Sequence, residues 1–229
     1  MSSPATWQAA RERVLLFSRR LLAERLVYFT AGNISMRIPD DPELVAVTPA
    51  STPYDTMRPE DIVIVRTDGR VVDGALRPTS ELPLHTLTYV RRDDVGGIVH
   101  THSAAAMAVA AMGIGIPPIL HGLVSACGGG IVTAPYARGG TAEVAERTAS
   151  ALRDRSACLL RNHGVLAIGP TVDHAYNAAS VVEGAADAYL RAFAFRPVPQ
   201  IAPDEVERIR REQWAPAWAR GPLAPTHGG

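Results

Sequence analysis

The chain has 229 residues, of which 47% are hydrophobic and 20% charged, a balance typical of a soluble globular protein. Lysine plus arginine and aspartate plus glutamate both number 23, so the formal net charge is zero. A neutral chain has no global field to attract nucleic acid or an anionic membrane, so we expect a small-molecule partner. The length predicts a single domain over residues 1–229, with a tail that becomes mobile from about residue 215.

The cellular location follows from what the sequence lacks. Two cysteines, Cys127 and Cys158, are too few for a secreted disulfide scaffold of this length. Residues 1–10 lack the charged start and apolar run of a signal peptide, and no apolar stretch reaches eighteen residues. The sequence therefore predicts a cytoplasmic protein that does not span a membrane.

Hydrophobic periodicity and turn signals predict an alternation of helices and strands. The expected helices cover residues 7–28, a segment opening at Pro78–Glu81 with Thr79 or Ser80 as N-cap, and then 104–112, 141–152, 172–193 and 203–213. The expected strands cover 36–38, 44–48, 62–65, 70–72, 97–102, 131–133, 157–160 and 165–168. Strands alternate irregularly with helices and meet in hairpins, so the class is α/β with a mixed or antiparallel sheet.

A histidine pair, His100-Thr101-His102, follows the apolar stretch Gly97–Val99. Side chains in a strand alternate between its two faces, so residues two apart point the same way. The two imidazoles can therefore approach one cation, although such a pair also occurs as hydrogen-bonded structural histidines. A third histidine, His163, lies between two apolar strands, where an imidazole needs a polar partner. Three such ligands and an open position describe a catalytic metal site.

Two further polar residues lie near the start of the helix that follows Pro78. Glu81 suits a helix start, because the helix dipole favours a carboxylate there, and it is also a fourth candidate ligand. His85 lies one turn further on and faces the same side, so we expect it to support the site without a primary role. Gly164 is expected to let the backbone turn sharply and bring His163 inward.

Five short motifs in this order resemble the class II aldolases of the L-fuculose-1-phosphate aldolase, L-ribulose-5-phosphate 4-epimerase and adducin-head family. The motifs are Thr30–Ser35, Thr79–Glu81, His100–His102, Ala134–Tyr136 and Asn162–Gly164, and the similarity extends from about residue 7 to residue 195. The order and separation of the motifs are specific for membership and much less specific for substrate.

The resemblance implies a three-layer α/β/α fold around a mostly antiparallel sheet, and a homo-oligomer, usually a C4 tetramer. It implies that His100, His102 and His163 bind one divalent metal per subunit, with zinc as the first candidate and manganese, cobalt or iron as alternatives. It also implies that Glu81 is the catalytic acid/base and contacts the metal before substrate arrives. Epimerase relatives carry aspartate there, so Glu81 is similar to the aldolases. A carboxylate in a partly dry pocket is expected to have a raised pKa.

Two positions depart from the sugar-phosphate aldolase pattern. The pair after Thr48-Pro49 is Ala50-Ser51, where those aldolases have Thr-Gly or Ser-Gly in the phosphate cradle. Phosphate can still meet the substrate-binding candidates, which are Gly32, Asn33, Ser51, Thr79 and Ser80. His121 appears where aldolases have a tyrosine that acts from a neighbouring subunit; it is either a second catalytic proton donor or a plain loop residue.

Three hypotheses about function follow. The first is a metal-dependent carbon–carbon lyase that performs retro-aldol cleavage of a hydroxylated ketone, with a ketose phosphate as one substrate, through an enediolate stabilised by the metal. The second keeps the metal but decarboxylates a hydroxylated aromatic or sugar-derived acid, with Arg37 facing the carboxylate. The third is a non-catalytic, adducin-like binding module, which the retained histidines and Glu81 disfavour.

Overall fold

An eight-stranded mixed sheet forms the middle layer of the computed structural model, which describes residues 4–219. Along the sheet the order is β4-β3-β2-β1-β5-β8-β7-β6, and each neighbouring pair is antiparallel except β6 with β7. The strands are β1 (Asn33–Ile38), β2 (Asp41–Val47), β3 (Val63–Arg66), β4 (Val71–Asp73), β5 (Gly97–Thr101), β6 (Thr133–Ala134), β7 (Ala157–Leu160) and β8 (Gly164–Gly169). The mostly antiparallel sheet is confirmed.

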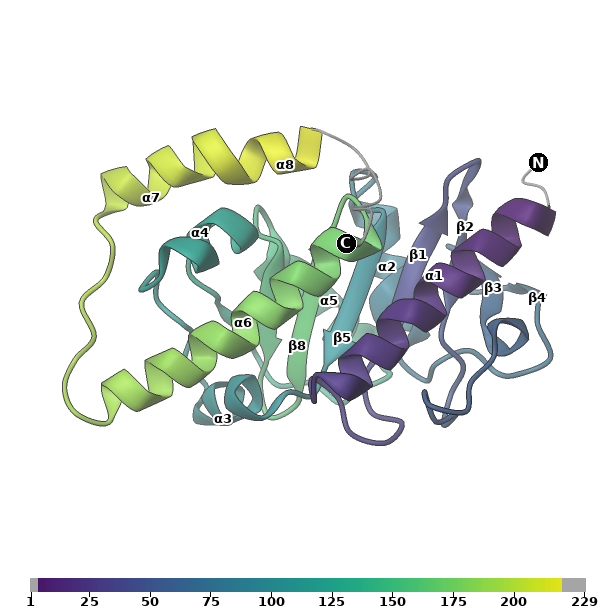
Figure 1. Ribbon diagram of the computed structural model, residues 1–229, viewed down its shortest axis with the longest axis horizontal. Coiled ribbons are helices and arrows are strands. Elements are labelled where there is room, and N and C mark those ends of the chain that lie inside the picture. Colours follow the sequence, from purple (N-terminus) through teal and green to yellow (C-terminus); the bar gives the residue numbers. More distant parts are fainter. Residues whose placement is uncertain (1–3, 220–229) are drawn as a thin grey trace, which may run out of the picture.

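Helices cover both faces of this sheet, as the three-layer expectation requires. The helices are α1 (Pro4–Ala23), α2 (Leu82–Arg91), α3 (Ala104–Met112), α4 (His121–Cys127), α5 (Ala142–Leu152), α6 (Val172–Phe193), α7 (Pro203–Ile209) and α8 (Ala215–Ala219). Short 3₁₀ (Pro59–Asp61) and π (Arg210–Trp214) segments complete the set. α1, α3 and α6 lie on one face, and α2 and α5 on the other (Figure 1).

The alternation of strand residues divides the hydrophobic core in two. Val99 and Val165 pack on the α6 side, whereas Ile98 and Leu166 pack on the α2 side. Two fully buried layers are what an α/β/α arrangement needs, because each face of the sheet must be covered. His100 has the same parity as Ile98 and pairs with Leu166, so it points to the α2 side.

The ends of several helices differ from the sequence expectation. α1 ends at Ala23, not at residue 28, and the chain then turns through Arg25, which has a positive φ. Helical structure near the C-terminus continues beyond residue 213, through α8 to Ala219, where a tail had been expected. The rest of that expected tail, residues 220–229, lies outside the described residues.

No helix within residues 4–219 is both long and apolar enough to cross a bilayer. The cytoplasmic location stays a prediction.

Candidate functional site

The histidine pair lies at the end of β5, in the middle of the sheet. His100 is fully buried and lies between Asn33 of β1 and Leu166 of β8 in the strand register. His102 follows the last residue of β5, and its Nε2 lies 2.9 Å from the Nε2 of His100. The expected side-by-side arrangement is therefore present, and it comes from the two-residue period of an extended chain.

His163 approaches this pair from the turn between β7 and β8. Its ring centroid lies 4.8 Å from that of His100 and 5.0 Å from that of His102. Asn162, with a φ of 56°, makes the turn, so the expectation that Gly164 makes it is wrong. Gly164 is needed for a different reason, because a Cβ there would lie 2.2 Å from the backbone oxygen of Thr101 on the neighbouring strand.

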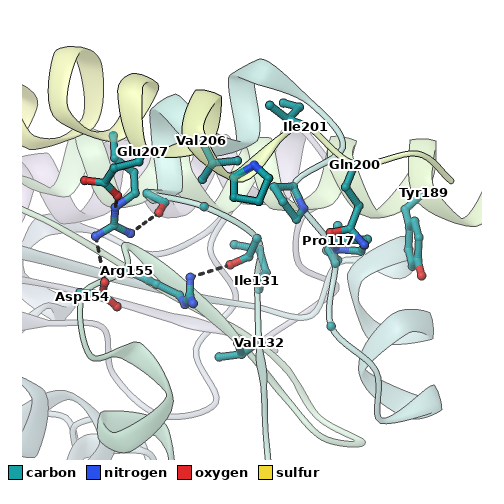
Figure 2. A pocket seen from close by; sticks show the side chains of 18 of the residues that line it. Pro117, Ile131, Val132, Asp154, Arg155, Tyr189, Gln200, Ile201, Val206 and Glu207 are labelled. Atoms are coloured by element: carbon teal, nitrogen blue, oxygen red, sulfur yellow. Dashed lines mark hydrogen bonds and ion pairs between the residues drawn. The ribbon is translucent and has the colours of Figure 1, made fainter.

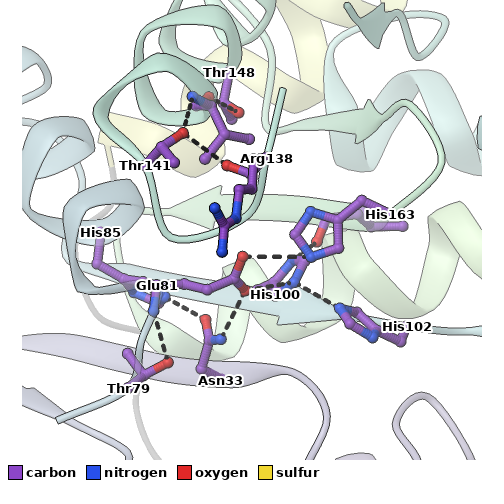
Figure 3. A network of polar contacts seen from close by, with 12 residues as sticks. Asn33, Thr79, Glu81, His85, His100, His102, Arg138, Thr141, Thr148 and His163 are labelled. Atoms are coloured by element: carbon purple, nitrogen blue, oxygen red, sulfur yellow. Dashed lines mark hydrogen bonds and ion pairs between the residues drawn. The ribbon is translucent and has the colours of Figure 1, made fainter. Parts of the chain in front are cut away.

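Glu81 reaches the three imidazoles from α2. It is the N-cap residue of α2, which begins at Leu82, so neither Thr79 nor Ser80 is the cap. Thr79 instead accepts a hydrogen bond from the Glu81 backbone N–H through its Oγ1, at 3.2 Å. The Glu81 carboxylate lies 2.9 Å from His100 Nε2 and 3.3 Å from His163 Nε2 (Figure 3).

The charge state of Glu81 differs from the sequence expectation. Burial alone would raise the pKa of this carboxyl, but the neighbouring His100 and His163 imidazoles and the Asn33 amide outweigh burial and hold the pKa below its usual range. The expectation of a raised pKa is therefore wrong. The sequence could not show that the carboxylate has three hydrogen-bonding or charged neighbours on one side. Glu81 is ionised at neutral pH.

The donor set fits a cation. His100 Nδ1 lies 2.7 Å from the Val165 carbonyl, which can only accept, so the proton of a neutral His100 is on Nδ1. The lone pair of its Nε2 then faces both the Glu81 carboxylate and His102 Nε2. These electron-rich atoms would repel one another, and a cation bound among them would remove that repulsion. One ligand atom from each of the four residues Glu81, His100, His102 and His163 lies within 4.8 Å of the others. The structure thus brings the four together, and their role as ligands stays a prediction.

A cavity of about 460 Å³ opens over this cluster. Its lining includes all five substrate-binding candidates, which are Gly32, Asn33, Ser51, Thr79 and Ser80. It also includes Arg77 and Gly139, which the sequence reasoning did not single out. Arg77 could have been found from the sequence, because it directly precedes the Pro78-Thr79 motif. Gly139 could not, because its loop comes near the site only through tertiary folding.

His121 lies elsewhere in its own subunit. It is the exposed first residue of α4, and its Nε2 lies 3.1 Å from Gln213 Oε1. It does not line the cavity over the histidines. A role in catalysis would therefore have to be exerted on the site of another copy, and it stays a prediction.

Another cavity, of about 810 Å³, lies between α7 and the loops near Pro117 and Ile131 (Figure 2). Its charged side chains already have partners: Arg155 donates to the Gly130 carbonyl at 3.1 Å, and Arg210 pairs with Asp154 at 2.8 Å. Its lining holds two arginines and two acidic residues but no histidine. We therefore take the cavity over the histidine cluster as the candidate active site.

Comparison with known proteins agrees with this site. Residues 12–190 match the family model of the class II aldolase and adducin N-terminal domain. The chain is 32% identical to a 5-deoxy-D-ribulose 1-phosphate aldolase of Bacillus thuringiensis serovar kurstaki, over 90% of this chain and 95% of that protein. It is 36% identical to the L-fuculose phosphate aldolase of Escherichia coli K12, over 77% and 81% of the two chains.

The solved structure of an L-fuculose 1-phosphate aldolase superposes with a TM-score of 0.86 at 29% identity, covering 93% of this chain and 97% of that one. Class II aldolases use a divalent metal, which the cluster of three histidines and one glutamate fits. The chain belongs to the class II aldolase and adducin family.

Proposed function

We propose that this protein is a metal-dependent aldehyde-lyase that cleaves a ketose 1-phosphate into dihydroxyacetone phosphate and an aldehyde. The observation that carries the proposal is the cluster of three imidazoles and one carboxylate, of which His102, His163 and Glu81 line the cavity beside a set of hydroxyl and backbone groups, with His100 buried behind them. The names of the two aldolases reported above both give a sugar phosphate as the substrate, and the first specifies a 1-phosphate. These names favour a ketose 1-phosphate as the substrate class.

The three imidazoles would hold the cation, and we propose zinc, because neutral nitrogen ligands with an open position suit it; manganese, cobalt and iron are the alternatives. A bound divalent cation would stabilise the negative charge that develops on the substrate's oxygens when the carbon–carbon bond breaks.

Glu81 would move the protons of the reaction. Its carboxylate is ionised at neutral pH, so it can take the proton of the substrate hydroxyl as the bond breaks. Because its pKa is low, the protonated acid would readily return a proton to the carbon of the dihydroxyacetone phosphate half.

Phosphate would bind at the opposite part of the cavity. Ser51 and Ser80 expose hydroxyl groups there, beside the backbone of Gly32 and Asn33. Ser51 has a φ of 55°, in the left-handed region that glycine favours, so the backbone turn of the cradle forms although serine replaces glycine. This supports a phosphorylated substrate in spite of the departures at residues 50 and 51.

We also propose that the chain works as a homotetramer with C4 symmetry and that His121 donates a proton to the site of a neighbouring copy. His121 is exposed and lies outside its own cavity, which suits this role. Mixing His121→Ala protein with Glu81→Gln protein would then restore activity, because some hybrid sites would contain both intact residues. Mixtures no more active than their components would refute the shared site.

The decarboxylase hypothesis loses its proposed carboxylate partner. The Arg37 guanidinium donates to the backbone carbonyls of Val95 and Tyr89, at 2.7 and 2.6 Å, and Arg37 lies toward the opposite end of β1 from Asn33, which lines the cavity. The binding-module hypothesis finds no support in a site that keeps all four cluster residues.

The proposal is tested by supplying zinc-loaded protein with L-fuculose 1-phosphate and 5-deoxy-D-ribulose 1-phosphate. We expect equal amounts of dihydroxyacetone phosphate and aldehyde from at least one of them, and no activity after chelation. Carbon dioxide from a sugar acid, with no aldehyde from either ketose, would overturn it.

A further inference from the structure

A continuous line of hydrogen bonds extends from Glu81 into the core between α2 and β1. Figure 3 shows its first two links, from Glu81 through Asn33 to His85. Asn33 Nδ2 lies 3.1 Å from Glu81 Oε2, and Asn33 Oδ1 lies 2.5 Å from His85 Nε2. Ser35 Oγ lies 2.6 Å from His85 Nδ1 and 2.9 Å from the Tyr89 hydroxyl. All five residues are at most 7% exposed, so water does not compete for these contacts.

The hydrogen-bonding geometry fixes the direction of each bond in this line. Asn33 Nδ2 donates to Glu81 Oε2, so the Asn33 amide oxygen faces His85. An amide oxygen only accepts, so the proton of His85 is on Nε2. Burial lowers the pKa of His85 to about 3, so the ring is neutral and its Nδ1 accepts from the Ser35 hydroxyl. Ser35 Oγ in turn accepts from Tyr89.

Two regular periods place these groups in one line. Residues 81, 85 and 89 are four apart, so they lie on one face of α2 and its N-cap. Asn33 and Ser35 are two apart on β1 and share the face that looks toward α2. His100 lies opposite Asn33 in the neighbouring strand, so the line ends beside the histidine cluster.

We propose that His85, Ser35 and Tyr89 are positioning residues, which hold the Asn33 amide in the orientation that donates to Glu81 and thereby keep the Glu81 carboxylate aimed at His100 and His163. This inference deepens the proposed function, on which its catalytic consequence rests. Without a donor at residue 85, the buried Asn33 oxygen would lose its partner, and the amide would leave this orientation to find another. Glu81 would then lose the N–H that holds its carboxylate in place.

The first test reads the proton on His85 directly and needs no turnover. Long-range ¹H–¹⁵N spectra of zinc-loaded, ¹⁵N-histidine-labelled protein separate the two neutral tautomers, and the signals absent from His85→Gln protein identify residue 85. We expect a protonated Nε2 and a bare Nδ1 at neutral pH. A proton on Nδ1, or on both nitrogens, would reverse the direction of the line and overturn the proposal.

The second test separates positioning from simple structural damage. His85→Leu removes both the donor and the acceptor, whereas glutamine can supply an N–H to Asn33 and an oxygen to Ser35. Thr88→Val is a matched control, because Thr88 is also buried on α2 and the substitution loses a hydrogen bond from Oγ1 to the Leu84 carbonyl that is not part of the line.

We expect His85→Leu to lower kcat about 10–100-fold with little change in KM, since supporting residues around metal sites have effects of this size. His85→Gln should recover most of the loss, and Thr88→Val should match the unmodified protein. Equal losses in all three variants would mean general damage and overturn the proposal.

If His85→Leu does not fold, Ser35→Ala is used in its place, because it removes only one hydroxyl of the line. It should give a smaller loss of kcat, and an unchanged kcat would count against the proposal. A protein with the expected tautomer but no lyase activity would refute the proposed reaction alone.

Discussion

The two parts of the candidate site are built in different ways. The histidine end, made of His100, His102, His163 and Glu81, is held by paired strands and a helix cap, with His100 fully buried and Glu81 7% exposed. The hydroxyl end, made of Gly32, Asn33, Ser51, Thr79 and Ser80, consists mostly of loop residues, and both serines are exposed. The rigid end suits bond breaking, which needs fixed geometry, whereas the loops suit the choice of substrate.

The largest effect is expected from His102→Ala, at the histidine end. Removing one of the three imidazoles takes away a proposed metal ligand, and the described residues of the cluster include no fourth histidine to replace it. We expect bound zinc, measured by metal analysis after dialysis, to fall well below one per chain and turnover to fall to background. His174→Ala changes a half-buried histidine on α6, outside the cluster, and should retain zinc. Full zinc occupancy in His102→Ala would remove residue 102 from the ligand set.

Glu81→Gln should separate proton transfer from metal binding. The three imidazoles remain, so zinc should stay bound, but the amide cannot take or return a proton. We expect kcat to fall at least about a hundredfold, the usual range for a general acid/base. We would measure kcat with either ketose 1-phosphate and bound zinc per chain by metal analysis of the same sample. Normal turnover would exclude Glu81 from the mechanism.

Gly139→Ala tests how closely the loop over residues 138–140 packs against the histidine end. A Cβ at this position would lie 3.1 Å from Glu81 Oε1 and 3.4 Å from His163 Cε1, closer than most Cβ contacts. We expect kcat/KM to fall about tenfold, equivalent to about 1.4 kcal/mol, with zinc retained. Gly184→Ala is the control, because a Cβ there meets nothing within 4 Å on α6. Equal activity of the two variants would show that the 138–140 loop yields easily.

The same division explains how far the sequence could predict the molecule. Alternation along a strand and helical periodicity are local rules, so the pairing of His100 with His102 and the extent of α5 could be predicted from a few residues. The convergence of His163 rested on its apolar surroundings and on the family resemblance. The lowered pKa of Glu81 and the approach of Gly139 could not be predicted, because both depend on contacts between segments that only tertiary folding brings together.

Substitutions at the hydroxyl end should have the smallest effects and a different kinetic form. Ser51→Ala and Ser80→Ala each remove one hydroxyl that we expect to meet the phosphate, without changing any residue of the histidine end. A hydrogen bond to a charged group contributes about 1.5–3 kcal/mol when water does not compete. Water competes at these exposed positions, so KM should rise by about fivefold or less. Because the contact is the same before and during bond breaking, kcat should change little. Steady-state kinetics distinguish the raised KM of the serine variants from the lowered kcat of Glu81→Gln. A loss of kcat in Ser80→Ala would mean that the hydroxyl end also takes part in bond breaking, so that the two ends do not have separate roles.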